Sequence, residues 1–333
     1  MQAIVVERLG GPEVLALRDV PDPVPGDGEV LVDVEAAGVF WLDTRIRRGQ
    51  GPPRHAAAPP YVPGGTVAGT VTAIGAHVDP ALLGTRVAGR GRDGGYAERV
   101  AAAAADLVPV PDGLDAGAAV ALFGDGNTAL ALLESTPVRR GEHVLVLPAA
   151  GGAGSLLVQL VAAAGGRVTG LVRGAERGAL VLGLGAEHVV DHVVEHGADH
   201  GAGHGSDGWV EQVHALVPAG PAVVFDGVGG PAGRSAAWLV ADGGRYTSYG
   251  VAGGPPPLLG AVEARARRLT VTGMDRLAGF AADRPRRARE LFARAAAGEL
   301  RPLIGAEYPL PDAARAHADL ERRRSTGTLV LRP

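Results

Sequence analysis

The segment Pro148–Ser155 (PAAGGAGS) carries the clearest chemical pattern in the sequence. It follows a continuously apolar run, Val144–Leu147, and precedes a helix that we expect over 155–164. Glycines in such a turn let backbone N–H groups approach a pyrophosphate, and the positive end of the following helix favours its negative charge. We therefore predict that Ala150, Gly151, Gly152, Ala153 and Gly154 contact a dinucleotide. The alternative is a glycine turn that only packs the helix on the strand.

Two arginines follow the next strand of this pattern, which we expect over 167–172. Sites for NAD commonly place an acidic side chain at this strand end, where it accepts hydrogen bonds from ribose hydroxyls. Here the strand is followed by Arg173 and, one turn later, by Arg177. A guanidinium group pairs with a 2′-phosphate through charge-assisted hydrogen bonds, so the sequence favours NADPH. The alternative is that both arginines are solvated residues at a helix start, beside Glu176.

Strands and helices alternate around these positions. We expect strands over 144–147, 167–172, 188–191, 222–226, 244–250 and 269–274, and helices over 155–164, 176–184, 209–217 and 232–240. Such alternation predicts a doubly wound parallel sheet, that is, an α/β fold.

The first third of the chain has a different spacing of apolar segments and turns. Short apolar runs at 3–7, 30–36, 67–74, 86–88 and 95–100 are separated by Pro/Gly turns, which is typical of a small β-rich barrel or sandwich. Helices over 115–123 and 128–134 lead into the alternating region, and a tail with a helix at 285–297 and a strand at 328–331 is expected to complete the first domain. We place the β-rich domain at 1–120 and 276–333, and the dinucleotide-binding domain at 121–275.

Composition removes several classes of enzyme. The chain of 333 residues, enough for about two domains, has no cysteine, and all 32 of its basic residues are arginine. A disulfide scaffold, a thiolate nucleophile, Cys-held zinc, a Schiff-base lysine and a Lys-dependent phosphate loop are therefore excluded. The net charge of −4 gives no support for nucleic-acid binding.

No apolar stretch approaches the roughly 18 uninterrupted residues of a membrane span. Charged residues also lie within the first eight positions, so the start does not resemble a signal peptide. We expect a cytoplasmic protein with no membrane partner.

Histidines recur every four residues at 188, 192, 196, 200 and 204. On one helix they would form a metal-binding face. Glycines at 197, 201, 203 and 205 disfavour such a helix, so we expect a Gly/His-rich loop over 192–208 and no metal site.

Motifs in order along the chain resemble one family. Gly11–Leu15 resembles a "GGPEVL" opening, 26–34 a "PGPGEVLVRV" strand, 37–43 an "AxGVNxxD" segment and 63–69 a "PGxExAG" segment. Further along, 149–154 resembles "AAGGVG", 185–191 "GADHVID", 226–230 "DPVGG", 243–250 "GGRLVSFG", 298–302 "GxLxP" and 327–331 "GKxVL". The chain thus resembles the zinc-independent medium-chain dehydrogenase/reductases, in the quinone oxidoreductase (zeta-crystallin-like) and enoyl reductase branch.

This resemblance implies a GroES-like substrate domain, a Rossmann NADPH-binding domain and a homodimer. It implies hydride transfer from NADPH to a quinone or a conjugated C=C bond. By resemblance, Arg177, His192 and Gly250 join the cofactor contacts, and Thr128 lies near the nicotinamide.

The chain departs from the family pattern at several positions. The Asn of "GVN" is Phe40 here, a following Tyr is Arg45, and the Glu of "PGxE" is Thr66. Phe40, with Trp41, would form an apolar pocket wall suited to an aromatic or polyketide-like conjugated carbonyl, or would pack in the core. Asp43 is retained, either for catalysis or as a cap of the turn that follows it.

The proton required for enone reduction has several candidate donors, namely water and the hydroxyls of Tyr61, Tyr246, Tyr249 and Thr128. Catalysis by zinc is not expected, because the chain has no cysteine and lacks the "GHE" motif, where Gly64-Gly65-Thr66 stands. The departures at Phe40 and Arg45 also support a second hypothesis, in which the protein binds nucleotide without redox turnover, as a structural or sensing protein or a non-redox cyclase.

Overall fold

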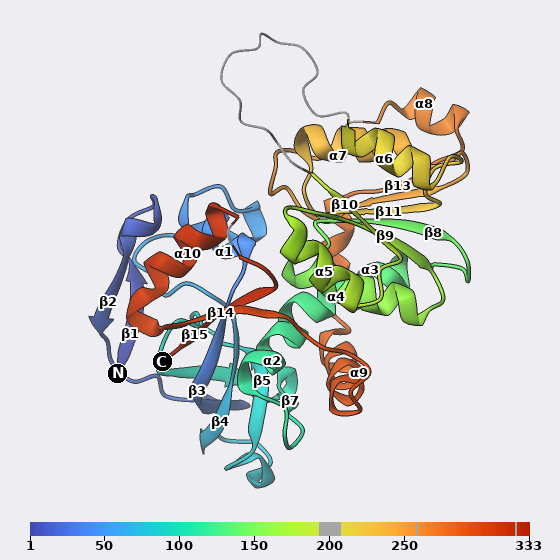
Figure 1. The fold of residues 1–333 in the computed structure, drawn as a ribbon. Helices are drawn as coiled ribbons and strands as arrows, with labels where there is room; N and C mark the ends of the chain where they lie inside the picture. Colours follow the sequence, from blue (N-terminus) through green and yellow to red (C-terminus); the bar gives the residue numbers. More distant parts are fainter. Residues whose placement is uncertain (193–207, 258, 324) are drawn as a thin grey trace. The chain divides into compact units, whose positions relative to one another are not determined.

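The computed structural model describes residues 1–192, 208–257, 259–323 and 325–333, with the side chains of Arg54, Leu277 and Ala278 excepted (Figure 1). The chain divides into two compact units. Unit 1 comprises Met1–Asn127 and Asp283–Pro333, and unit 2 comprises Thr128–Ala282. The domain boundaries expected from the sequence lie seven residues earlier at both junctions.

Unit 1 is built on a seven-stranded sheet with strand order β14-β15-β3-β4-β5-β7, and β6 pairs with β3. The strands are β3 (Glu29–Val39), β4 (Thr66–Ile74), β5 (Arg86–Arg90), β6 (Arg99–Ala103), β7 (Val108–Pro109), β14 (Ile304–Pro309) and β15 (Thr328–Arg332). All pairs are antiparallel except β14 with β15. A hairpin of β1 (Gln2–Val6) and β2 (Leu15–Asp19) packs its apolar side chains into the same core.

Helices of unit 1 cover this sheet. They are α1 (Trp41–Arg47), α2 (Ala116–Ala121), the π-helical turn η5 (Leu122–Gly126), α9 (Arg284–Ala296) and α10 (Ala313–Glu321). Short 3₁₀ turns lie at η1 (Pro12–Val14), η2 (Pro53–His55), η3 (Pro80–Leu82), η4 (Ala104–Asp106) and η7 (Leu310–Asp312). Helix α10 contacts α1 and β15, so the C-terminal tail belongs to the core of unit 1.

Unit 2 has a six-stranded, wholly parallel sheet with strand order β10-β9-β8-β11-β12-β13. The strands are β8 (His143–Leu147), β9 (Arg167–Val172), β10 (His188–Asp191), β11 (Val223–Asp226), β12 (Arg245–Ser248) and β13 (Thr270–Thr272). The strand order reverses between β8 and β11, the place where open α/β sheets bind ligands. This sheet confirms the doubly wound fold that the sequence predicts.

Helices lie on both faces of the parallel sheet (Figure 1). Helices α3 (Asn127–Ser135), α4 (Gly152–Ala163) and α5 (Ala175–Gly183) cover one face, while α6 (Gly208–Leu216) and α7 (Gly230–Leu239) cover the other. Helix α8 (Ala261–Ala266) and the 3₁₀ segment η6 (Met274–Ala281) flank β13 in the sequence. Apolar side chains of β8, β11 and β12 pack against α6 and α7.

Some sequence predictions of elements were wrong. The strand expected at 95–100 begins only at Arg99: the N–H groups of Gly95 and Tyr96 both donate to the carbonyl of Pro63, and Ala97 forms an isolated bridge with Ala3 on β1. The helix expected from Ser155 begins at Gly152. Elements β2, α1, α8, β14 and α10 were not predicted.

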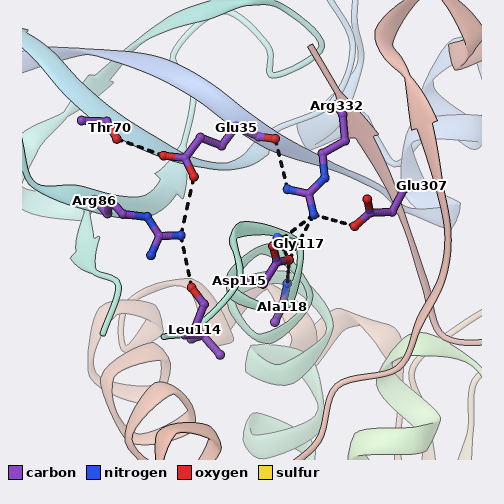
Figure 2. A network of polar contacts seen from close by, with 9 residues as sticks. All are labelled: Glu35, Thr70, Arg86, Leu114, Asp115, Gly117, Ala118, Glu307 and Arg332. Atoms are coloured by element: carbon purple, nitrogen blue, oxygen red, sulfur yellow. Dashed lines mark hydrogen bonds and ion pairs between the residues drawn. The ribbon is translucent and has the colours of Figure 1, made fainter. Parts of the chain in front are cut away.

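An ion network fixes the start of α2 to the C-terminal strand (Figure 2). Arg332 on β15 donates to both carboxylate oxygens of Asp115, at 3.1 and 3.2 Å, and to Glu307 on β14 at 2.5 Å. Asp115 in turn accepts the N–H groups of Gly117 and Ala118 at 2.7 and 3.3 Å, which caps α2. The carbonyl of Glu35 on β3 accepts a further bond from Arg332 at 3.3 Å. The network therefore links three strands to one helix N-terminus.

The helical run Ala116–Ser135 is long and apolar enough to cross a membrane by length and composition alone. However, 72% of its apolar window is buried. That burial is typical of a core helix in a folded protein.

Replacing Asp115 with alanine tests the network. The change removes a helix cap and leaves Arg332 with one carboxylate partner fewer, so we expect the free energy of unfolding to fall by about 1–2 kcal/mol. Urea unfolding followed by circular dichroism measures the change. Asp112→Ala, a nearby exposed aspartate, serves as the control, and an equal loss in both variants would contradict the assignment.

Candidate functional site

The glycine turn of unit 2 joins β8 to α4 through a close approach of the two elements. A Cβ atom at Gly154 would overlap with the carbonyl oxygen of Pro148, so the first turn of α4 can lie this close only with glycine at 154. The N–H of Ala149 donates to the carbonyl of Leu171 at 2.9 Å, which ties the turn to β9. The N–H groups of Gly152, Ala153 and Gly154 lie in the first helical turn and have no partner within the helix. They form a donor set for an anion such as a pyrophosphate.

The predicted arginines lie beyond the carboxyl end of β9. Arg173 is exposed and Arg177 half-buried, and an Arg177 N–H group donates to the Arg173 carbonyl at 3.5 Å. Between them, Gly174 has a φ of +84°, a conformation that favours glycine. Both carboxylate oxygens of Asp191, at the end of β10, accept the Gly174 N–H at 3.1 Å. The Asp191 carboxylate is thereby bound to the backbone of the turn, and the turn carries the guanidinium groups of Arg173 and Arg177.

His192 lies beside this turn. Its N–H donates to the carbonyl of Val172 at 2.8 Å, and its ring lies 5.9 Å from that of Trp209 on α6. The imidazole therefore stands at the carboxyl ends of β9 and β10, the position expected from the sequence for a cofactor contact.

A buried acid organises the loops after β11 and β12. Asp226 accepts the N–H groups of Val228 and Gly229 at 2.7 and 2.9 Å, and the Tyr246 hydroxyl donates to its other oxygen. Burial raises the pKa of Asp226 and of Tyr246. Because the Tyr246 hydroxyl is already committed to Asp226, it is a poor choice among the four proton donors considered from the sequence.

The loops after β8, β11 and β12 are joined to one another. The Gly227 N–H donates to the Leu147 carbonyl at 2.6 Å, and the Tyr249 N–H donates to the Asp226 carbonyl at 2.7 Å. Gly250 lies against the carbonyl of Gly227. Unit 2 thus brings the predicted cofactor contacts Ala150, Gly151, Gly152, Ala153, Gly154, Arg173, Arg177, His192 and Gly250 to the carboxyl edge of its sheet. Thr128 lies in the first turn of α3.

In unit 1, Asp43 occupies the first turn of α1 and is 9% exposed. Its Oδ2 accepts the N–H of Phe40, the residue before the helix, at 2.9 Å, so the side chain bonds to the start of α1 and not to the turn after Asp43 that the sequence suggested. The Phe40 ring lies against Gly38 and Gly124. A catalytic role for Asp43 and a pocket-wall role for Phe40 stay predictions.

A buried chain of polar side chains connects Asp43 to α10. The Tyr96 hydroxyl lies 3.4 Å from Asp43 Oδ2 and 3.0 Å from His317 Nε2, and an Arg47 nitrogen lies 3.1 Å from His317 Nδ1. Tyr96, His317 and Arg47 are fully buried. Arg47 also pairs with Glu321. Burial, with the nearby Arg47 charge, lowers the pKa of His317 to about 3, so its imidazole is neutral.

A second acid of unit 1, Asp125, lies on the π-helical turn η5. It accepts the Thr328 hydroxyl at 2.7 Å, and burial raises its pKa to about 6. Sequence patterns gave no sign of Asp125 or of the Tyr96–His317–Arg47 chain, because each joins residues far apart in the sequence. The one feature that could have indicated the chain is His317, a single histidine on the buried face of the C-terminal helix α10.

Among the described residues, no group of three or more His, Cys, Asp or Glu side chains could hold a metal ion. Histidines 196, 200 and 204 of the Gly/His-rich segment lie outside the described residues.

Family models match both parts of the chain. Residues 26–112 match the alcohol dehydrogenase GroES-like domain, and residues 184–331 match the zinc-binding dehydrogenase family. Curated relatives extend the similarity to the whole length. Quinone oxidoreductases of Pseudomonas aeruginosa and Sus scrofa are 35% and 34% identical, over 97% and 99% of this chain and 97% of each relative.

The chain belongs to the quinone oxidoreductase branch of the medium-chain dehydrogenase/reductases. The GroES-like and Rossmann folds expected from the sequence are thereby confirmed. A 2-haloacrylate reductase of a Burkholderia species is 28% identical over 100% of this chain and 99% of its own.

Solved structures agree with this family. A mycobacterial protein complexed with NADPH matches with a TM-score of 0.88 and 35% identity, over all of both chains. The Escherichia coli quinone oxidoreductase complexed with NADPH matches with a TM-score of 0.87 and 27% identity, also over all of both chains.

The neutral state of His317 predicts how stability depends on pH. The native imidazole has a pKa of about 3, whereas an ordinary histidine binds a proton below about 6.5. The unfolded chain therefore binds more protons in this range, and this group's contribution to the unfolding free energy falls as the pH drops below about 6.5, by about 1.4 kcal/mol per pH unit. Urea unfolding at several pH values measures the slope. His317→Gln should lack this contribution and the exposed His214→Gln should keep it; identical slopes in His317→Gln and wild type would contradict the burial argument.

Proposed function

We propose that the protein is a cytoplasmic, NADPH-dependent reductase that transfers a hydride to a quinone or a conjugated enone without a metal. The observation that carries the proposal is the glycine turn, whose N–H groups at 152–154 have no partner within the helix and lie on the same sheet edge as Arg173 and Arg177. Full-length similarity to quinone oxidoreductases and to a 2-haloacrylate reductase supports reduction of a conjugated bond.

The residues of unit 2 fit NADPH by their donor chemistry. The N–H groups of 152–154 would bind the pyrophosphate, and Arg173 and Arg177 would bind the 2′-phosphate. His192 and Gly250 would complete the cofactor contacts, and Thr128 would lie near the nicotinamide. Bound NADPH supplies the hydride; the protein's task is to orient the two reactants and stabilise developing charge.

The substrate side of the proposal rests on unit 1. Phe40 would form an apolar wall, which favours a flat aromatic or polyketide-like conjugated carbonyl. A Cys-held catalytic zinc has no ligands in this sequence, because the chain contains no cysteine. Polarisation of the carbonyl therefore falls to protein hydrogen-bond donors.

A homodimer is part of the proposal. The edge strand β13 of unit 2 carries Val271, which is 44% exposed, and the adjacent α8 carries Val262, which is 85% exposed. An apolar sheet edge of this kind is suited to covering by a second copy. An elution mass near the 33.7 kDa of one chain would contradict a dimer.

The second hypothesis, nucleotide binding without turnover, is favoured by one observation. Phe40 replaces the family's asparagine, and its ring packs against Gly38 and Gly124. A side chain that fills space in this way would leave less room for a substrate.

Oxidation of NADPH separates these two functions. We expect the wild-type protein to consume NADPH, followed by its absorbance, with at least one member of a panel of quinones and enones. Tight NADPH binding without turnover on any of them would favour the second hypothesis.

Cofactor choice is tested by replacing both arginines. Arg173→Ala combined with Arg177→Ala should weaken NADPH binding by about 1.5–3 kcal/mol for each charge-assisted hydrogen bond lost, and should leave NADH binding nearly unchanged. Calorimetric titration with each cofactor measures the effect. Arg265→Ala, an exposed arginine of α8, is the control, and equal weakening of NADPH and NADH would remove the 2′-phosphate argument.

A further inference from the structure

The buried Arg47 sets the direction of a hydrogen-bond chain. A guanidinium group only donates, so His317 Nδ1 must accept from Arg47. The neutral imidazole then carries its proton on Nε2 and donates it to the Tyr96 oxygen at 3.0 Å. The Tyr96 hydroxyl hydrogen is left to point at Asp43 Oδ2, 3.4 Å away. Because Arg47 can only donate, His317 and Tyr96 each have a fixed donor and a fixed acceptor atom in this chain.

This chain distinguishes the two carboxylate oxygens of Asp43. Oδ2 accepts both the Phe40 N–H and the Tyr96 hydroxyl. Within the described part of the chain, no protein group donates to Oδ1, and Oδ1 is not among the fully buried atoms that lack a partner. A proton on Asp43 would therefore sit on Oδ1, the oxygen that reaches solvent.

The surroundings of Asp43 raise the pKa of its carboxyl group toward neutral pH. Burial is the main cause that raises its pKa, to about 6, while the Phe40 N–H, Arg90 and Tyr96 act in the opposite direction. The other titratable groups that act on Asp43 or on its neighbours come from three elements and one loop, and they are Asp125 on η5, Arg47 on α1, His317 on α10 and Tyr61 in the loop before β4. An acid in this range can release and regain a proton at neutral pH.

We propose that Asp43 donates, from Oδ1, the proton that accompanies hydride transfer to a conjugated enone, and that Arg47, His317 and Tyr96 are positioning residues that keep Oδ2 as the acceptor. This proposal rests on the reductase function proposed above. It adds a proton donor to that function and three residues that orient it.

The C=C π bond breaks, the β-carbon gains the hydride that NADPH supplies, and the electron pair moves to the α-carbon and the carbonyl. The O–H bond of Asp43 breaks and a C–H bond forms at the α-carbon. The enone is reduced, the cofactor is oxidised, and the Asp43 carboxylate regains a proton from water at Oδ1.

Asp43→Asn separates catalysis from capping. An asparagine oxygen still accepts the Phe40 N–H and the Tyr96 hydroxyl, so the helix start should survive, but the side chain has no acidic proton. We expect unchanged NADPH affinity and a kcat for enone reduction lowered about 100-fold or more. Wild-type kcat in this variant would overturn the proposal.

Tyr96→Phe tests the positioning chain through the pH profile of kcat. With Asp43 as the acid, wild-type kcat should fall as the pH rises through the Asp43 pKa near 6. The Tyr96 hydroxyl stabilises the carboxylate, so its removal should move this fall to higher pH. Tyr308→Phe, which removes a 3.0 Å hydrogen bond to Asp319 in the same unit, should leave the profile unchanged. A uniform loss of kcat at every pH in Tyr96→Phe would indicate a purely structural role and overturn the assignment.

Infrared difference spectra between wild type and Asp43→Asn supply a readout that does not require turnover. A protonated-carboxyl band should disappear as the pH rises through about 6 in wild type, and at higher pH in Tyr96→Phe. If the band disappears with the same pH midpoint in wild type and in Tyr96→Phe, or if wild type shows no such band, the positioning role of the chain is overturned.

Stereochemistry distinguishes failure of this proposal from failure of the reductase function. With 2-methylcyclohex-2-enone in D₂O, the wild type should place deuterium at the α-carbon in one configuration, and the residual Asp43→Asn product should be mixed. If wild type reduces no enone or quinone, the reductase function fails and the proton-donor role fails with it. If wild type is active and Asp43→Asn keeps a single configuration, only the assignment of Asp43 fails.

Discussion

The contact between the first turn of α4 and the carbonyl of Pro148 is the constraint on which the proposed nucleotide site depends. Glycine at 154 lets the helix start lie against the end of β8, and the three N–H groups of 152–154 have no partner within the helix. The same turn is bonded to β9 through Ala149 and to the loop after β11 through Gly227. The carboxylate of Asp226 then holds the rest of that loop by accepting the N–H groups of Val228 and Gly229. The edge that would receive a nucleotide is thus fixed by backbone bonds and one buried carboxylate, while the charged groups, Arg173 and Arg177, lie at its surface.

Unit 1 is organised by a different kind of interaction, a permanent charge buried at Arg47. A charge in that position requires partners, and it finds them in Glu321, in the Gly10 carbonyl and in His317. Burying this charge costs free energy that is offset only if every partner keeps its hydrogen bond. The side chains from Arg47 to Asp43 are therefore held in one hydrogen-bonded arrangement. The C-terminal helix α10 is therefore more than a structural cover, because it supplies the histidine at the centre of the chain.

The sequence predicted the regular parts of the fold well. Strands β9 and β10 were predicted with the bounds that the structure gives, because each is a short valine-containing segment that follows a glycine-containing turn. The glycine turn was recognisable since its chemistry is local. The Tyr96–His317–Arg47 chain was not predictable, because Arg47 and His317 are 270 residues apart and nothing in either neighbourhood indicates the other. The strand expected at 95–100 was placed too early, because residues 96–98 form only an isolated bridge to β1 and the ladder with β3 begins at Arg99.

Label transfer from [4-²H]NADPH tests the central claim most directly. The purified protein is incubated with the deuterated cofactor, labelled on each face in turn, and a panel of enones, and the products are analysed by mass spectrometry and NMR. A reductase of the proposed kind transfers one deuterium from one face of the nicotinamide to the β-carbon of the product. Tight binding of the cofactor with no deuterium in any product would contradict hydride transfer and leave a nucleotide-binding protein.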